Sequence, residues 1–324
     1  MAILARQEVV KRNQQARPTR QRGHWSRYSS RTFYLFVAPW VIGFMTLTAL
    51  PLAYALMISF TDWDGISTRW HWVGLDNYAQ LLQNADTWYS LGRTLLYTGI
   101  AVPLSIAGGL GLALLLNQRL KAVGFFRTIF YVPSIVPVVA TAIMWKLIFD
   151  RDAGVLNAFL QRLGLPALTW LVDPTAFYAL IVLTLWGLGG GMVIMLAGLQ
   201  GIPTELNEAA VVDGANRWQA FRSITLPMLS PVIFFQVVTG VIASLQVLVQ
   251  PLLLSETNTI SQAVNVPRSN FVYMVNVYEQ FFVNQRFGYG SAMLWVFFVV
   301  ILAITVLVLR SGSFWVYYEV DRDN

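Results

Sequence analysis

The chain has 324 residues, of which 56% are hydrophobic and 12% are charged, whereas soluble domains carry about 25% charged residues. So much apolar surface exceeds what a soluble core of this size can bury, and we expect lipid to be the solvent for most of the chain. The absence of cysteine excludes a disulfide framework and a thiolate metal site. The net charge of +6 is not spread evenly, which argues against a nucleic-acid-binding surface.

Residues 1–32 form a mostly polar, basic tail. Eight of the 22 basic residues lie there, and only Glu8 opposes them. Basic flanks of membrane spans stay in the cytoplasm, so we expect a cytoplasmic tail. It has little of the aromatic or motif support of an RNA-binding arm. A secretory signal would place its apolar run near the start, so we expect no cleaved signal.

Charge-free apolar windows follow the tail. A hydrocarbon core about 30 Å thick needs roughly 20 apolar residues per helix. The third window is short unless residues 147–149 extend it past Lys146, and the fourth and fifth exceed one span, so their ends must lie in loops or interfacial turns. The sequence predicts an all-α membrane protein with six transmembrane helices, in windows 33–60, 94–116, 128–145, 174–204, 223–255 and 287–309.

Residues 271–283 are apolar but contain Glu279 and are too short for a span, which favours an interfacial or re-entrant segment. A seventh span there is the alternative, and it would move the C-terminus to the other side. With six spans and a cytoplasmic N-terminus, 15 basic residues fall on the cytoplasmic side and 7 outside. This bias predicts that both termini are cytoplasmic.

The sequence lacks the motifs and charged groups that would indicate catalysis, metal binding or ion coupling. No phosphate-binding loop occurs, His24 and His71 are far apart, and no catalytic or metal-binding constellation is evident. An ion-coupled secondary carrier keeps an ionisable group inside the membrane as its coupling handle, and these windows have no obvious one. A membrane-embedded enzyme would need clustered catalytic groups. If the chain moves solutes, the energy must enter from outside the membrane.

One polar block, residues 203–231, interrupts the apolar windows. We expect Thr204 to be the N-cap of a helix that stops at Gly214. Asn216 and Gln219 have the spacing of a capping box for a second short helix. Trp218 and Phe221 are aromatic anchors typical of interfaces. An amphipathic loop resting on the bilayer is the alternative that composition leaves open.

The order of residues in this block resembles the EAA loop of ABC importer permeases: Glu208-Ala209-Ala210, Asp213-Gly214-Ala215, Trp218, Phe221, Ile224, Leu226-Pro227 and Pro231. The similarity covers about residues 33–311. It includes the segments VGLDNYAQLL, LALLLNQRLKAVGFFRTIFYVPSIVPVV, LAGLQGIPTEL and FGYGSAMLW, which look like the carbohydrate-uptake branch and, within it, the maltose-F and glycerol-phosphate-A type.

The resemblance implies a type I importer permease that is not itself an enzyme, in a bacterial or archaeal inner membrane. A second, different permease would pair with it, two copies of an ATPase would bind ATP and Mg beneath it, and a solute-binding protein would dock outside. Residues 33–311 would form the permease domain and 312–324 a cytoplasmic tail. Residues 203–227 would couple to the ATPase through Glu208, Ala209, Ala210, Asp213, Gly214, Trp218, Phe221, Leu226 and Pro227.

The resemblance also suggests residues along the solute pathway. Matched by distance from Glu208, these are Gly187, Gly190, Gly240 and Ser244, and Gln246 and Gln250 lie on the same span and could bind hydroxyls. For each polar residue, an interhelical hydrogen bond is the alternative role. The stretch PLLLSETNTISQAVNVPRSN departs from the family's pattern. The resemblance implies that the solute is a sugar or sugar-like polyol moved by alternating access, open among a disaccharide, an oligosaccharide, glycerol phosphate and a glycosylglycerol. A non-sugar solute is the alternative.

Overall fold

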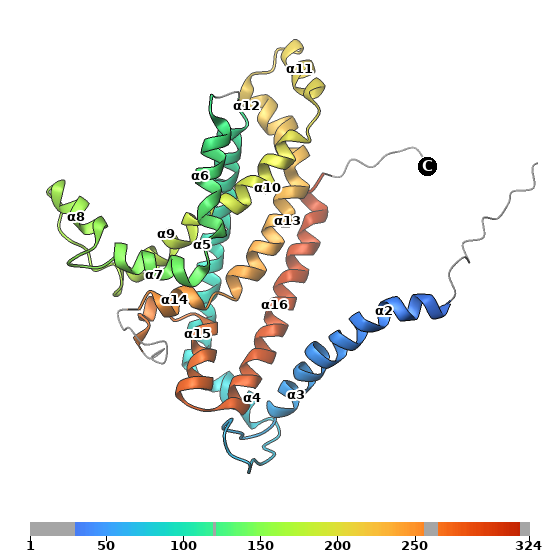
Figure 1. Ribbon diagram of the computed structural model, residues 1–324, viewed down its shortest axis with the longest axis vertical. Helices are drawn as coiled ribbons and strands as arrows, with labels where there is room; N and C mark the ends of the chain where they lie inside the picture. The colour runs from blue at the N-terminus through green and yellow to red at the C-terminus, as the bar shows by residue number, and fades with distance from the viewer. Residues whose placement is uncertain (1–29, 119–120, 256–264, 318–324) are drawn as a thin grey trace, which may run out of the picture. The chain divides into compact units, whose positions relative to one another are not determined.

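The computed structural model describes residues 30–118, 121–255 and 265–317, and within these ranges the chain is helical without strands (Figure 1). The all-α prediction is confirmed for them. One isolated antiparallel bridge joins Thr61 to Trp72. The chain divides into two compact units, residues 1–54 and 55–324.

The described part of the first unit is helical. It comprises α2 (Ser30–Phe44), the π-helical turn η1 (Met45–Ala49) and the start of α3 (Leu50–Ile58). The helical run Arg31–Ile58 is long and apolar enough to cross a membrane, and 6% of its most apolar window is buried. The π-turn precedes Pro51, which has no N–H to donate, and such turns often accommodate an interrupted hydrogen-bond ladder. The predicted first window therefore forms one helical run.

The second unit holds the remaining helices. Each of the five other predicted windows corresponds to one long helix or to a pair of helices, and the rest are short connecting elements. In chain order they are α4 (Asp76–Gln83), α5 (Ala85–Leu116), α6 (Val123–Ile135), α7 (Val138–Ile148), α8 (Val155–Arg162), α9 (Ala176–Trp186), α10 (Gly189–Gln200), α11 (Thr204–Val212), α12 (Arg217–Ala220), η2 (Phe221–Thr225), α13 (Leu226–Leu245), α14 (Val249–Leu253), η4 (Arg268–Asn270), α15 (Tyr273–Tyr278), η5 (Glu279–Val283) and α16 (Phe287–Trp315).

Four continuous helical runs among the described residues qualify as spans, and two bent pairs raise the number to six if each pair counts as one. The third window is not one helix, because α6 and α7 meet at a 100° bend. Pro137 explains the break, since a proline disfavours helical backbone in the residue before it, and Val136 is extended with ψ 133°. The fourth window bends by 44° between α9 and α10. The six-span count stays a prediction.

The second window is longer than the apolar run. Helix α5 begins at Ala85 rather than at residue 94, because Asn84 caps it by accepting a hydrogen bond from the Asp86 N–H. The charged residues of its first turns have partners in the fold. Asp86 pairs with Arg268, and Arg93 Nε donates to Ser269 O at 2.8 Å.

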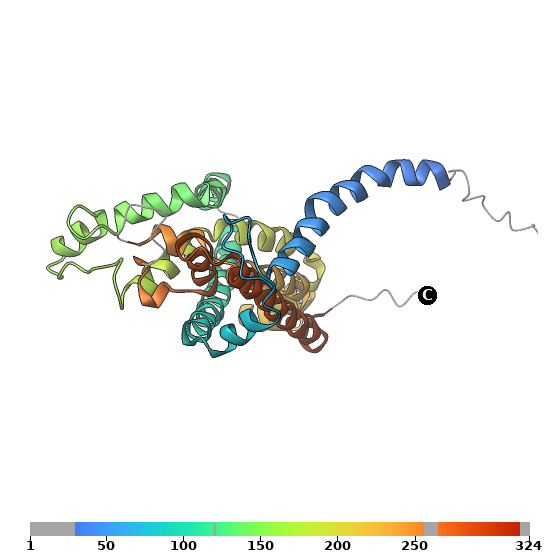
Figure 2. The ribbon, with the colours of Figure 1, turned by 90° about the horizontal axis from the view of Figure 1, so that it is seen from below.

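Helix α5 lies at the centre of the second unit, with α10 and α13 packed on it (Figures 1 and 2). Helix α6 packs on α10, and α16 packs on α13. Small residues allow these approaches. A Cβ on Gly109 of α5 would lie 3.4 Å from the Met192 N of α10, and a Cβ on Gly189 would overlap the Phe130 carbonyl of α6.

The helix ends gather in two groups, as expected for spans that cross a membrane in alternating directions. The end of α5, the start of α6, the α11–α12 block and the end of α16 gather at one end of the unit, and α4, α15 and the start of α16 lie at the other (Figure 1). We call the first the block end. Which side of the membrane it faces stays a prediction.

The apolar segment 271–283 forms α15 and η5 and is not a candidate span among the described residues. Tyr273, Val275 and Val277 are buried in the protein, and α15 packs on α5 and α16. The Tyr273 N–H donates to Thr94 Oγ1 at 2.8 Å. Its apolar character therefore reflects protein packing, which composition alone does not distinguish from contact with lipid.

Replacing Gly189 by alanine should destabilise the protein by roughly 1–3 kcal/mol, the usual cost of overpacking, because the new Cβ meets the backbone of Phe130. The matched control is Gly111→Ala, where a Cβ would meet nothing within 4 Å. The measurement is the thermal unfolding midpoint of each purified variant in detergent. Equal midpoints for the two variants would contradict the described contact between α6 and α10.

Candidate functional site

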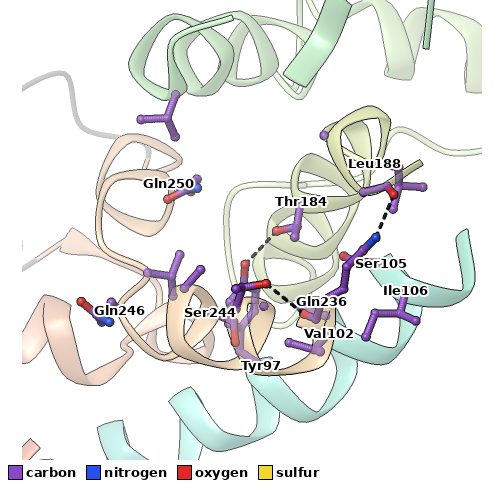
Figure 3. Close-up of a pocket in the computed structure, with 18 of the residues that line it drawn as sticks. Tyr97, Val102, Ser105, Ile106, Thr184, Leu188, Gln236, Ser244, Gln246 and Gln250 are labelled. Atoms are coloured by element: carbon purple, nitrogen blue, oxygen red, sulfur yellow. Dashed lines mark hydrogen bonds between the residues drawn. The ribbon is translucent and has the colours of Figure 1, made fainter. Parts of the chain in front are cut away.

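A cavity of about 700 Å³ opens between α5, the α9–α10 break, α13 and the connection from α13 to α14 (Figure 3). Helix breaks form two of its walls. Helix α9 ends at Trp186 and α10 begins at Gly189, while α13 ends at Leu245 and α14 begins at Val249. Interrupted helices at membrane depth are tolerated where they line a cavity. The cavity therefore lies beside two breaks in the helices of the bundle.

The polar groups at the cavity are hydroxyls and amides. Tyr97 and Thr184 share a hydrogen bond of 2.9 Å between their hydroxyls, and they point toward one another in Figure 3. Ser244 Oγ donates to Thr98 Oγ1 at 3.1 Å, which joins α13 to α5. Among the residues that the structure describes, the lining includes no Asp, Glu, Lys, Arg or His. Such a wall offers uncharged donors and acceptors beside apolar surface, which is how many small-molecule sites fix the orientation of a ligand.

Five of the six predicted pathway residues line this cavity: Gly187, Gly240, Ser244, Gln246 and Gln250. Gly190 does not, because its Cβ position faces Ser134 of α6 at 3.7 Å. Ser244 also bonds within the fold, as does Gln246, whose Nε2 donates to Ile242 O at 3.0 Å. The interhelical role weighed from the sequence therefore applies to Ser244, whereas the Gln246 bond stays within the end of α13.

Sequence reasoning missed the residues that α5, α9 and the middle of α13 contribute. The resemblance selected a few positions by their distance from Glu208, which left out α5 and the other polar residues of the segments before and after the block. The hydroxyl and amide residues inside otherwise apolar windows were an available signal, because polar groups at membrane depth need partners or a cavity. These residues are Tyr97, Ser105, Thr184, Gln236 and Thr239.

The polar block begins with α11, and the expected cap is wrong. Pro203 occupies the N-cap position without a side-chain hydrogen bond, and Thr204 is the first helical residue. The predicted stop is confirmed. Gly214 has φ +80°, its N–H donates to Val211 O at 3.1 Å, and the Ala215 N–H donates to Ala210 O at 2.9 Å. This pair of bonds is a Schellman motif, whose left-handed residue is usually glycine.

A confirmed capping box starts the next helix. Asn216 Oδ1 accepts from the Gln219 N–H at 2.9 Å, and Gln219 Oε1 accepts from the Asn216 N–H at 2.7 Å. The Trp218 and Phe221 rings stack with centroids 5.5 Å apart. From Arg217 the helix continues through the π-turn η2 into α13 as far as Leu245. The block is thus the end of a long helix that reaches the cavity.

Most residues predicted for coupling are exposed at the tip of the block. Val211, Val212 and Trp218 are 71%, 87% and 68% exposed, which is unusual for large apolar side chains at the end of a folded unit. Glu208, Ala209, Asp213 and Gly214 are exposed too. Ala210 is the exception at 7%, so its methyl group is not at the surface and supports the fold instead. Phe221 and Pro227 are half-buried at the base, and Leu226 is at the margin of exposure.

The end of α16 is fastened beside this base. The Tyr317 N–H donates to the buried Ser230 Oγ at 2.8 Å, and the Trp315 and Phe234 rings meet edge to face at 5.7 Å. A Cβ on Gly312 would approach the Phe234 ring to 2.8 Å. If the block end of α13 moved, these contacts would therefore transmit the force to α16 as well.

The opposite end of the unit is held by charges and turns. Arg268 pairs with Asp86 and lies over the Tyr89 ring at 4.1 Å. Burial acts to raise the pKa of Asp173, but hydrogen bonds from Ser269 and Arg268 outweigh it and lower that pKa below its usual value. The stretch that departs from the family's pattern is only partly visible here, since residues 256–264 lie outside the described residues. Its described residues include Arg268 and Ser269, which make the contacts at this end of the unit.

This helical architecture agrees with comparisons against known proteins. The family model described as "Binding-protein-dependent transport system inner membrane component" matches residues 101–323. The chain belongs to this family of multi-pass membrane proteins.

The chain resembles named members of ABC transport systems. It is 39% identical over 291 residues to the probable ABC transporter permease protein YesP of Bacillus subtilis, covering 88% of this chain and 92% of that protein. It is 32% identical to the trehalose/maltose transport system permease protein MalF of Thermococcus litoralis, covering 87% and 93%. The arabinooligosaccharides transport system permease protein AraP of Bacillus subtilis is 31% identical, covering 87% and 88%.

A solved structure supports the fold. A chain from a bacterial ABC transporter involved in the import of the acidic polysaccharide alginate superposes with a TM-score of 0.75 at 24% identity, covering 87% of this chain and 94% of that chain. At this identity the similarity establishes the architecture and not the solute. The predicted permease fold is thereby supported.

Replacing Gly214 by valine should unravel the end of α11, because a β-branched residue is strained at positive φ even though a Cβ there has open space. Amide hydrogen exchange of residues 209–216 should speed up, while exchange in α5 and α10 stays unchanged. Val212→Ala is the matched control, since Val212 is exposed and has ordinary helical backbone. Unchanged protection of residues 209–216 in the Gly214 variant would refute the Schellman assignment.

Proposed function

We propose that this chain is the permease subunit of an ATP-driven, binding-protein-dependent ABC importer for a neutral carbohydrate. It forms a pathway with a second, different permease and works by alternating access. ATP and Mg bind to a homodimeric partner ATPase beneath the block end, and a solute-binding protein delivers the sugar at the opposite end. The family match and the named relatives support this assignment.

The single observation that carries the solute class is the cavity. Its lining offers the hydroxyls of Tyr97, Thr184 and Ser244 and the amide of Gln250, with no charged side chain. Sugar hydroxyls are donors and acceptors at once, so they suit such a wall, and relatives named for trehalose/maltose and arabinooligosaccharides fit this chemistry. Glycerol phosphate is disfavoured, because a buried phosphate needs a cationic partner.

In this proposal, the polar block passes the energy of the ATPase to the cavity wall. Its exposed apolar tip at Val211, Val212 and Trp218 is suited to a protein groove, since large apolar residues at the end of a helical unit are stabilised by a partner surface. Closure of the ATPases on ATP would push this tip, and the continuous helix Arg217–Leu245 would carry the motion to the cavity wall. A secondary carrier is the weaker alternative, because the lining holds no carboxylate, histidine or basic side chain.

Filling the cavity should block transport. Gly240 lines it from α13, so Gly240→Trp should reduce uptake of the transported sugar into proteoliposomes at least tenfold while the partner subunits still co-purify. Gly99→Trp is the matched control, because Gly99 is exposed on α5 and its Cβ position is open. Normal uptake by the Gly240 variant would contradict a pathway through this cavity.

Charging the tip should uncouple the ATPase. Ala209 is exposed on α11, and Ala209→Glu should weaken co-purification of the ATPase and lower sugar-stimulated ATP hydrolysis, because an unpaired charge would have to be buried at the contact. Ala153→Glu, also at an exposed alanine, is the control. The docking role fails if both variants retain the ATPase and its stimulation equally.

A further inference from the structure

Helices α7 and α8 form an arm that leaves the bundle sideways (Figures 1 and 2). Helix α6 has 13 residues and rises about 20 Å, less than a hydrocarbon core of about 30 Å. If α6 starts at the membrane surface nearest the block end and runs alongside α10, the 100° bend falls inside the far leaflet. Helix α7 then runs almost parallel to the membrane plane, and α8 continues from it.

The arm carries an apolar stripe at helical spacing. On α7 the exposed residues Val139, Ile143 and Leu147 are four apart. The same spacing recurs at α8 with Val155, Phe159 and Leu163, which are 71%, 57% and 60% exposed. Residues four apart lie on one face of a helix, so each helix presents a continuous apolar stripe.

The opposite side of α8 is fixed to the protein by one side chain. Asn157 is 1% exposed, and its Oδ1 accepts from the Leu168 N–H at 3.1 Å and from Trp170 Nε1 at 3.0 Å. Its Nδ2 donates to Leu168 O at 2.9 Å and to Arg151 O at 3.0 Å. Trp170 in turn packs on Phe149 at 5.7 Å. The face that α8 turns outward is therefore set by the fold.

We infer that the stripe formed by Val155, Phe159 and Leu163 inserts into the lipid interface of the leaflet opposite the block end. It continues the exposed surface of α7, which belongs to a candidate span. Helix α8 has 8 residues and covers about 12 Å, too little to supply the roughly 800 Å² per partner of a standard protein interface.

Charge plays little part in this contact. Arg151 and Arg162 flank α8, and Asp150 and Asp152 offset them, so residues 150–163 have no net charge, and Lys146 of α7 leaves the arm at +1. Asp150 is further engaged by the N–H groups of Asp152 and Ala153, which lower its pKa. The insertion therefore depends on apolar burial and should not require anionic lipid.

The absence of native cysteine allows a direct test. Phe159→Cys and Val155→Cys carry a spin label on the stripe, and Gln161→Cys carries it on the polar side of α8 as the matched control. Each full-length variant is placed in nanodiscs of phosphatidylcholine, alone and with its co-purifying subunits. The measurement compares collision rates of the label with oxygen, which concentrates in lipid, and with a water-soluble nickel chelate.

The expected result is a several-fold excess of oxygen over nickel collisions at positions 155 and 159 and the reverse at 161, unchanged when phosphatidylglycerol is added. Nickel collisions dominating on the stripe overturn the inference. Low rates with both reagents in the assembled complex also overturn it and assign the stripe to a partner subunit. Dependence on phosphatidylglycerol overturns the apolar mechanism. The inference rests on the proposed membrane placement but not on the solute, so failed sugar uptake leaves it intact.

Discussion

The crossing of three helices at Gly191 is the constraint on which the rest of the second unit depends. Gln236 of α13 donates its Nε2–H to the Gly191 carbonyl of α10 at 2.9 Å, and on α5 a Cβ at Gly109 would lie 3.5 Å from the Gly191 carbonyl carbon. A side chain at residue 191 would itself meet the Gln236 amide at 2.9 Å. A side chain at residue 191 would displace the Gln236 amide, so glycine there preserves the hydrogen bond that joins α13 to α10 at the cavity wall.

The crossing also fixes α13 beside a broken helix. The Gln236 side chain donates to a carbonyl in the first turn of α10, next to the α9–α10 break. From Gln236 the same helix runs without interruption back to Trp218, about 27 Å at the usual rise per residue. The described chain thus links its exposed tip to its most irregular region through one rigid element, with α16 fastened alongside by Ser230 and Tyr317.

The sequence predicted what local chemistry determines. The capping box at Asn216 and Gln219 and the helix stop at Gly214 follow from residue types at fixed spacing, and both are present. The apolar windows located helices because lipid requires long apolar runs. The start of α5 was missed because Asp86 and Arg93, which look unsuited to a span, have their partners in residues 268 and 269, far along the chain. The bend at Pro137 needed its tertiary context, since a proline can also be accommodated within a helix, as Pro133 is in α6.

The residues of the candidate site also divide into those that sequence spacing located and those that depend on tertiary packing. Spacing from Glu208 reached Gly187, Gly240 and Ser244 because they lie on helices continuous or nearly continuous with the block. Spacing did not reach Tyr97, which enters the cavity through the packing of α5 on α13. It also misplaced Gly190, because the α9–α10 bend turns that residue toward α6.

Cavity chemistry and energy source constrain each other in the proposed function. A ligand shifts a conformational equilibrium only by its differential affinity for the two states. A lining of hydroxyls and amides lacks a carboxylate or histidine that could bind a proton in one state and release it in the other, so the driving free energy has to be applied elsewhere. The tip at Val211, Val212 and Trp218 is where a partner has most to gain, because those side chains are exposed and apolar at the far end of the same rigid helix. In the proposed function, a neutral pathway and an exposed tip therefore go together, because sugar would bind and energy would be applied at opposite ends of α13.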